Sequence, residues 1–190
     1  MHENDRDLVL GNLVRAIHLL EACPEFAAIV PEVRVNLAFA LPDASGPSQV
    51  AAVEGRITRV GDRPRASGLP AFGASDHMAR LLVETMRREP GLRAGINFAW
   101  SEELLAHLKA TGRAPVGIDR TREPAEAADR DRASMPWKIE TLVRAAGGVP
   151  RLFFESAGLG KEPLFVLLGE DAVAVAEEAC RIARSFAAAS

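Results

Sequence analysis

The chain lacks tyrosine altogether and has only two cysteines and four histidines among its 190 residues. Cys23 and Cys180 lie near opposite ends, with no CxxC spacing and no histidine beside them, so we expect two buried small side chains rather than a disulfide. The histidines form neither an HxH nor an HxxxH pair, which disfavours a zinc site built from histidine. Proton chemistry must therefore come from His, Asp, Glu, Lys or Cys.

Long apolar runs and an excess of basic residues are also missing. No apolar stretch approaches the roughly 18 residues needed to span a bilayer, and the acidic start at residues 1–5 is unlike a secretory signal. The 23 Lys and Arg against 26 Asp and Glu give a net charge of −3, so no general nucleic-acid-binding surface is indicated. We expect one cytoplasmic domain over residues 1–190, with no nucleic-acid or membrane partner.

Hydrophobic periodicity alternates along the chain between helical and strand-like, which predicts an α/β domain. Helices are expected over 5–22, 76–88, 101–112, 137–146 and 170–188. Strands are expected over 33–40, 50–53, 57–60, 94–100, 116–118, 151–155 and 163–168. Residues 61–70 are expected to form a surface loop, and 119–133 either a mobile loop or a frayed helix. Because the last two strands are close in sequence, the sheet should be mixed rather than purely parallel.

A small-residue turn, a cap and a lone imidazole come together at the start of the second helix. Gly73 and Ala74 form the turn, and Ser75 or Asp76 can accept hydrogen bonds from the first free backbone N–H groups. Such a helix start favours anions, and His77 beside it is well placed to donate a proton or a hydrogen bond to a phosphate. A capped helix with a solvated histidine is the plainer alternative.

A second element with features of a phosphate-binding loop lies between the last two predicted strands. Gly158 and Gly160 permit close backbone approach, and Lys161 offers a mobile cation. The glycine spacing and the absence of Ser or Thr after the lysine exclude a P-loop, and an ordinary turn remains the alternative.

Four further side chains could reach a ligand. Arg56 follows Gly55 at a sharp turn or bulge, and a guanidinium can clamp a diphosphate through two parallel hydrogen bonds. Asn36 and Asn97 lie within apolar strands, where they either tie loops to the sheet or face a ligand. Trp137 either stacks on a heteroaromatic ring or packs in the core, behind Ser134 as a helix cap.

Taken in order, these blocks resemble the ThiN-type thiamine-phosphate synthase domain. The resemblance covers nearly the whole chain and rests on residues 31–33 with Asn36, 53–57, 72–80, 96–97, 134–137 and 158–163. It implies a three-layer α/β/α fold with a mixed central sheet, similar to the class II aldolase (AraD-like) family. The resemblance also implies a domain that is often fused behind a hydroxymethylpyrimidine phosphate kinase and sometimes stands alone.

The reaction implied by the resemblance joins hydroxymethylpyrimidine diphosphate to hydroxyethylthiazole phosphate, giving thiamine monophosphate and pyrophosphate. The critical arginine and histidine of that family fall on Arg56 and His77. Arg56 is then expected to clamp the diphosphate and His77 to donate to the departing oxygen, while Lys161 and its glycines hold the thiazole phosphate and Asn36, Asn97 and Trp137 orient the pyrimidine. The expected substrate-binding residues are Asn36, Gly73, Ala74, Ser75, Asp76, Arg80, Asn97, Trp137, Gly158, Gly160, Lys161 and Glu162.

The expected partners are therefore two small-molecule substrates, and the chain could form a homo-oligomer. No cofactor is certain; Mg²⁺ could accompany the diphosphate, although no carboxylate cluster marks a site for it. Two alternatives remain open. One is a non-catalytic domain that senses thiamine phosphates, although only about one helix precedes Val33, too little for a separate DNA reader. The other is an aldolase-like lyase, which the missing histidine cluster disfavours.

Overall fold

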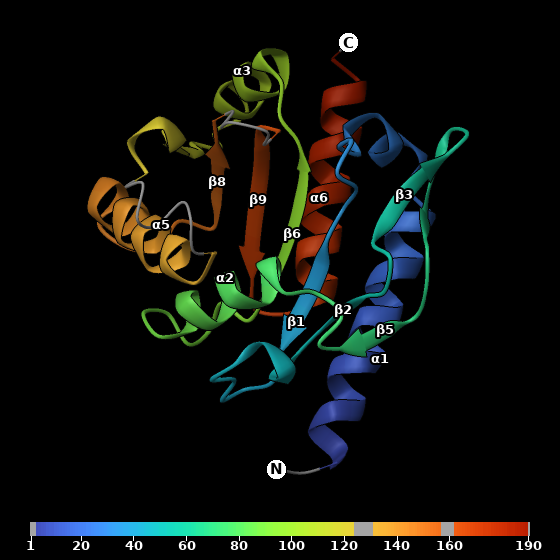
Figure 1. The fold of residues 1–190 in the computed structure, drawn as a ribbon. Coiled ribbons are helices and arrows are strands. Elements are labelled where there is room, and N and C mark those ends of the chain that lie inside the picture. The colour runs from blue at the N-terminus through green and yellow to red at the C-terminus, as the bar shows by residue number, and fades with distance from the viewer. Residues whose placement is uncertain (1–2, 124–130, 157–161, 190) are drawn as a thin grey trace.

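In the computed structural model, which describes residues 3–123, 131–156 and 162–189, a seven-stranded sheet runs through the molecule with helices on both faces (Figure 1). Neighbouring strands are antiparallel except β7 and β8, which are parallel, so the predicted mixed sheet is confirmed. In sheet order the strands are β5 (Pro70–Phe72), β2 (Val50–Val53), β1 (Leu37–Ala40), β6 (Ala94–Ala99), β9 (Leu164–Gly169), β8 (Leu152–Glu155) and β7 (Val116–Ile118).

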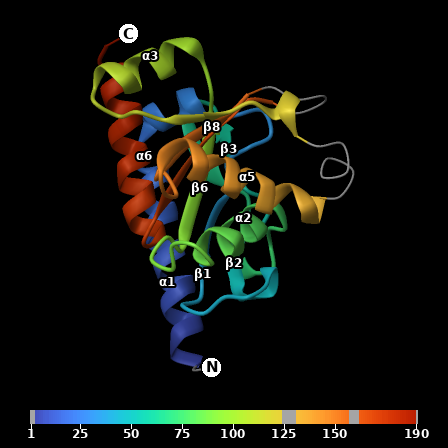
Figure 2. The same cartoon turned by 90° about the vertical axis from the view of Figure 1, so that its left-hand side faces the viewer.

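Two helices cover each face of the sheet. Helices α1 (Glu3–Glu21) and α6 (Ala172–Ala187) pack together on one face, and α2 (His77–Met86) and α5 (Asp131–Ala146) on the other (Figures 1 and 2). The short α3 (Glu102–Ala110) packs against α6. Apolar residues at helical spacing explain this arrangement, because those of α1 and α6 are buried in one core and those of α2 and α5 in the other.

The prediction of a surface loop over 61–70 is wrong. Residues Arg63–Ala66 form β4, which pairs antiparallel with β3 (Ile57–Val60), and the chain then enters β5. A two-residue turn of Gly61 and Asp62 joins β3 to β4, and Gly61 has the positive φ of 63° that favours glycine in such turns. The arginines and proline that suggested a loop are tolerated because this ribbon has only two strands, so each is an edge strand.

Two other element boundaries differ from expectation by four residues or more. Strand β1 starts at Leu37 rather than 33, because Arg34 has a positive φ of 67° and only Val35 forms a bridge, to Ile57. Helix α5 begins at Asp131 rather than 137, so Ser134 lies inside the helix and does not cap it. Two short 3₁₀ turns, η1 (Pro24–Ile29) and η2 (Pro47–Gln49), lie before β1 and β2, and a third, η3 (Arg120–Arg122), follows β7.

Because of their directions, several strands begin or end on the same side of the sheet. This side, which runs across the strand ends, is called the edge below. Because β9 is antiparallel to both β6 and β8, strands β6 and β8 end at the same edge, together with β7. The first residues of β1 and β9 and the last of β2 lie there too, through their antiparallel pairing. Ligands of α/β domains bind preferentially at edges of this kind.

Cys23 and Cys180 are both free thiols and both buried, as expected. Burial raises the pKa of the Cys180 thiol, so this sulfur is held in its unreactive protonated form. Among the described residues, no helix combines the length and the apolar character needed to cross a membrane.

Candidate active site

A cavity of about 300 Å³ opens at this edge, on the face covered by α2 and α5. It brings together five of the residues predicted from the sequence, namely Asn36, Arg56, His77, Asn97 and Glu162. Its remaining lining residues are Val33, Met78, Leu81, Arg120, Glu155, Leu164 and Val166. The cavity therefore combines charged ends with apolar walls, as small-molecule sites commonly do.

Arg56 is fixed by a pair of reciprocal hydrogen bonds between two turns. Gly55 and Arg56 have φ values of 66° and 69°, which turn the chain sharply after β2. The Nη1 of Arg56 donates to the carbonyl oxygen of Val33 (2.6 Å), and Nη1 of Arg34 donates to that of Gly55 (3.3 Å). Among the described residues, the guanidinium of Arg56 is therefore held at the cavity by one hydrogen bond, with most of its N–H donors left for other partners.

His77 is the first residue of α2, and its side chain lines the cavity. Ser75 satisfies the helix start, because its hydroxyl accepts the N–H of Met78 (3.3 Å) and also the Nδ2 of Asn36 (2.8 Å). Asp76 makes no capping bond and instead forms an ion pair with Arg80 (2.7 Å). Gly73 and Ala74 form the exposed turn before the helix, with φ of 79° at Gly73.

The two asparagines tie the sheet to the loop before β1. The Oδ1 of Asn97 accepts the backbone N–H of Asn36 (2.5 Å), and its Nδ2 donates to the carbonyl oxygen of Arg34 (3.3 Å). Both side chains are buried and both line the cavity. The two roles that the sequence left open, tying loops and facing a ligand, are thus compatible at this position.

A buried charge network, which sequence reasoning missed, forms the other end of the cavity. The Nζ of Lys138 donates to both carboxylate oxygens of Glu155 (2.9 and 2.8 Å). Arg120 reaches Glu155 through Nη1 (2.9 Å) and Glu123 through Nη2 (3.1 Å). The hydroxyl of Ser134 also donates to Glu123. Two cations and two carboxylates make this network formally neutral.

Burial explains why the network must be paired. Lys138 is 0% exposed, and desolvation lowers the pKa of its ammonium despite the opposing attraction of Glu155. Burial acts to raise the pKa of Glu123, but hydrogen bonds from Ser134 and Arg120 outweigh it and hold that pKa below its ordinary value. The signal in the sequence was the position of Glu155 at the end of one strand and Arg120 just beyond another.

Glu162 forms hydrogen bonds with the backbone of the loop before β1. Its carboxylate accepts the N–H groups of Glu32 and Val33, both at 3.1 Å. The start of β9 is thereby fastened to the same loop whose carbonyl oxygen, on Val33, holds Arg56. Glu162 thus supports the geometry of the cavity in addition to lining it.

Two further predicted residues belong to the described part of the chain. Arg80 does not line the cavity, and Trp137 lines a separate hollow with Gly117 and Thr141. The predictions for Gly158, Gly160 and Lys161 fall outside the described residues.

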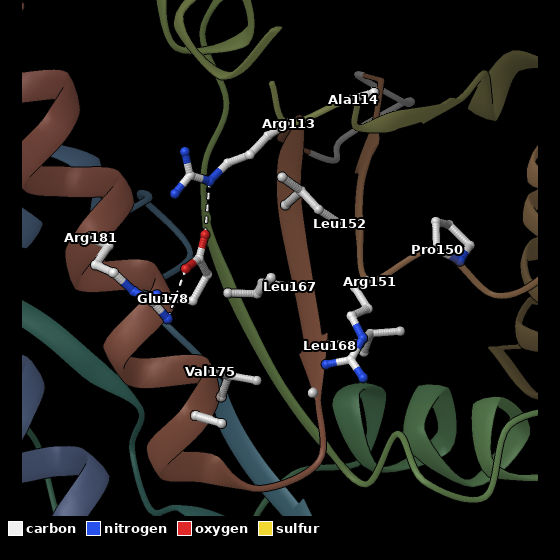
Figure 3. A pocket seen from close by; sticks show the side chains of 12 residues that line it. Arg113, Ala114, Pro150, Arg151, Leu152, Leu167, Leu168, Val175, Glu178 and Arg181 are labelled. Carbon is white, nitrogen blue, oxygen red and sulfur yellow. Dashed lines mark hydrogen bonds and ion pairs between the residues drawn. The ribbon is translucent and has the colours of Figure 1, made fainter. Parts of the chain in front are cut away.

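Another cavity, of about 440 Å³, lies between α6 and strands β8 and β9 (Figure 3). None of the residues predicted for the site lines it. Arg113 and Arg181 point toward Glu178 and pair with it (2.8 and 3.0 Å), and Arg151 pairs with Glu170 (2.9 Å). Its charged groups therefore already have partners on the protein.

The fold and the first cavity define an α/β domain with a small-molecule site at one edge of a mixed sheet. The chain belongs to the ThiN family of thiamine-phosphate synthases, whose family model matches residues 12–181. The resemblance recognised from the sequence is thereby confirmed at the level of the family.

Individual relatives agree with this assignment. Thiamine-phosphate synthase ThiN of Methanothermobacter thermautotrophicus is 36% identical over 177 residues, 93% of each chain. The bifunctional thiamine biosynthesis protein ThiDN of Methanocaldococcus jannaschii is 31% identical over 182 residues, which cover 92% of this chain and 40% of that protein. A solved structure, the C-terminal domain of phosphomethylpyrimidine kinase, is similar with a TM-score of 0.85 at 30% identity, over 93% of this chain and 99% of that one.

Proposed function

We propose that the chain is a thiamine-phosphate synthase, a transferase that joins hydroxymethylpyrimidine diphosphate to hydroxyethylthiazole phosphate with release of pyrophosphate. The observation that carries the proposal is that Arg56 and His77, 21 positions apart in the sequence, line one cavity. Membership of the ThiN family supports the same reaction.

The residues at the Arg56 end of the cavity suit the departure of pyrophosphate. As the bond between the pyrimidine methylene and the diphosphate breaks, negative charge grows on the leaving oxygens and positive charge on the methylene carbon, which the thiazole nitrogen attacks. Arg56 would hold the diphosphate, and His77 would donate to the departing oxygen. The N–H groups at the start of α2 would add further donors. Preorganised donors of this kind stabilise the transition state more than the bound substrate.

The second substrate needs another anion-binding group. We retain Lys161, with Gly158 and Gly160, as the proposed contact for the thiazole phosphate. Glu155 and Glu162, which flank this segment in the sequence, both line the cavity. This neighbourhood supports the proposal.

The described carboxylates do not fit a resident Mg²⁺ site. Glu155 accepts from Lys138 and Arg120, and Glu162 accepts from two backbone N–H groups. Within the described ranges, no group of three or more His, Cys, Asp or Glu side chains is placed to hold a metal ion. Mg²⁺ therefore enters only as a companion that the diphosphate could bring.

We also propose finer features that the resemblance and the composition of the chain implied. These are a class II aldolase-like version of the α/β/α arrangement, a cytoplasmic location, and small-molecule rather than nucleic-acid or membrane partners. The three layers of helix, sheet and helix support the first of them.

The test is to incubate the purified chain with both phosphorylated halves and to measure thiamine monophosphate and pyrophosphate. We expect the two products in equal amounts, with no product when either half is omitted. Tight binding of thiamine monophosphate without turnover would instead identify a sensor, which is the competing function.

Replacing Glu162 should weaken substrate binding more than chemistry. Glu162→Ala leaves the N–H groups of Glu32 and Val33 without their acceptor and loosens the loop that holds Arg56. A lost hydrogen bond to a charged group corresponds to roughly a 10-fold effect, so we expect KM for the pyrimidine diphosphate to rise about 10-fold. Steady-state kinetics with Glu162→Gln, whose amide oxygen can still accept, should give a smaller rise. An unchanged KM in Glu162→Ala would contradict this role.

A further inference from the structure

The neutral end of the cavity still has hydrogen-bonding capacity that the described residues do not use. A guanidinium carries five N–H groups, and Arg120 donates two side-chain hydrogen bonds to described residues, to Glu155 and Glu123. The Oε2 of Glu155 accepts from both Lys138 and Arg120, whereas Oε1 accepts from Lys138 alone among the described residues. Within that part of the chain, donors of Arg120 and one acceptor site of Glu155 therefore remain side by side.

Charge argues against an anion at this end. Arg120 and Lys138 are balanced by Glu123 and Glu155, so a phosphate placed here would meet two carboxylates within the same network. The side chains of Arg120 and Glu155 are each 7% exposed, and their partners hold them in place. A neutral, rigid pair of donor and acceptor is suited to a neutral ligand with a complementary pair.

The strand register places this pair at the end of an apolar floor. Asn97 on β6 pairs with Val166 on β9, and Glu155 on β8 pairs with Leu164 on β9. Because Leu164 and Val166 are two residues apart, all four side chains lie on one face of the sheet. Glu155 lies two strands across and two residues along the sheet from Asn97, about 12 Å at the usual strand spacings. The two aliphatic side chains between them offer a surface for a flat ring.

We propose that Arg120 and Glu155 bind the amino-substituted edge of the pyrimidine substrate, with the ring over Leu164 and Val166 and the diphosphate toward Arg56. Arg120 donates to the ring nitrogen beside the amino group, and Glu155 accepts from the amino group itself. The proposal rests on the proposed synthase function for the identity of the ligand. It gives Arg120 and Glu155 the task of selecting this heterocycle.

An analogue with the opposite hydrogen-bonding edge tests the assignment. In the 4-oxo pyrimidine diphosphate, the ring nitrogen becomes a donor and the exocyclic atom an acceptor, the reverse of the 4-amino compound. We expect the wild-type chain to bind the 4-amino diphosphate at least about 10²-fold more tightly than the 4-oxo compound, measured by calorimetry without the thiazole half. Equal affinities in the wild type would overturn the proposal without any variant.

Glu155→Gln supplies the second arm, since its amide brings a donor to the position of the carboxylate. We expect the preference for the 4-amino compound to fall below about 10-fold, while affinity for inorganic pyrophosphate, which lacks the ring, stays unchanged. The double variant Glu155→Gln with Lys138→Met removes both charges of the buried pair and serves if the single variant is unstable. Glu170→Gln, an exposed carboxylate paired with Arg151, is the matched control. An undiminished preference in folded Glu155→Gln would also overturn the proposal.

These outcomes are separate from those for the synthase. A wild type that discriminates between the two analogues but forms no thiamine monophosphate would refute the synthase and leave this selection intact. A wild type that forms product but binds both analogues equally would support the synthase and refute this selection.

Discussion

Arg56→Ala is expected to lower kcat/KM for thiamine monophosphate formation by at least about 10²-fold, the order seen when a charge-stabilising donor is removed from a transition state. Arg56 lines the cavity together with His77, and its guanidinium is positioned by the bond to the carbonyl oxygen of Val33. Loss of this group leaves the developing charge on the diphosphate without its bidentate partner. The measurement is the steady-state rate of product release with both substrates varied.

Two further variants distinguish a role of Arg56 in the reaction from a role in the structure. Arg56→Lys keeps the positive charge but loses the planar pair of donors, so we expect it to recover only part of the activity. Arg59→Ala removes an exposed arginine from β3, whose Nε donates to the carbonyl of Gly61 in the same hairpin, and should leave the rate unchanged. If Arg56→Ala melts at the wild-type temperature and turns over normally, Arg56 is not the diphosphate clamp.

Several strands could be predicted from the sequence because each carries its own local signal. Strands β2, β3 and β7 have the expected bounds, 50–53, 57–60 and 116–118, since turn residues closely flank each short β-rich run. The β8–β9 hairpin followed from two apolar runs separated by glycines. Local composition was sufficient in these cases.

The errors in the fold arose where tertiary contacts override local composition. Strand β4 contains two arginines and a proline, and its pairing with β3 depends on a partner strand rather than on its own propensity. The early start of α5 likewise accompanies a contact across the chain, from Ser134 to Glu123.

The residues of the candidate site also divide into those with a local signal in the sequence and those without one. Arg56 and His77 were found because a sharp turn and a helix start leave signatures in the sequence. Arg120 and Glu155 were missed because charged residues in a mixed-charge segment look solvated until Lys138 is seen to be buried against them. Trp137 lines a separate hollow instead of this cavity. The sequence could not show which side of α5 faces the cavity.

His77→Ala should also reduce kcat by roughly 10²-fold or more, because the donor to the departing oxygen is lost. His77→Gln distinguishes a proton donor from a hydrogen-bond donor, since the amide can do only the second. If His77 acts as the acid, the rate of His77→Gln stays low; if it acts by hydrogen bonding, much of the rate returns.

The matched control for this series is His18→Ala, an exposed histidine of α1 that does not line the cavity. It should leave the rate unchanged. Activity preserved in His77→Ala would remove the imidazole from the mechanism, and the N–H groups at the start of α2 would then have to stabilise the leaving pyrophosphate with Arg56 alone. In that case the loss of rate in Arg56→Ala should be larger than the loss expected if His77 shared the role. The reason is that the remaining backbone donors carry only partial charge.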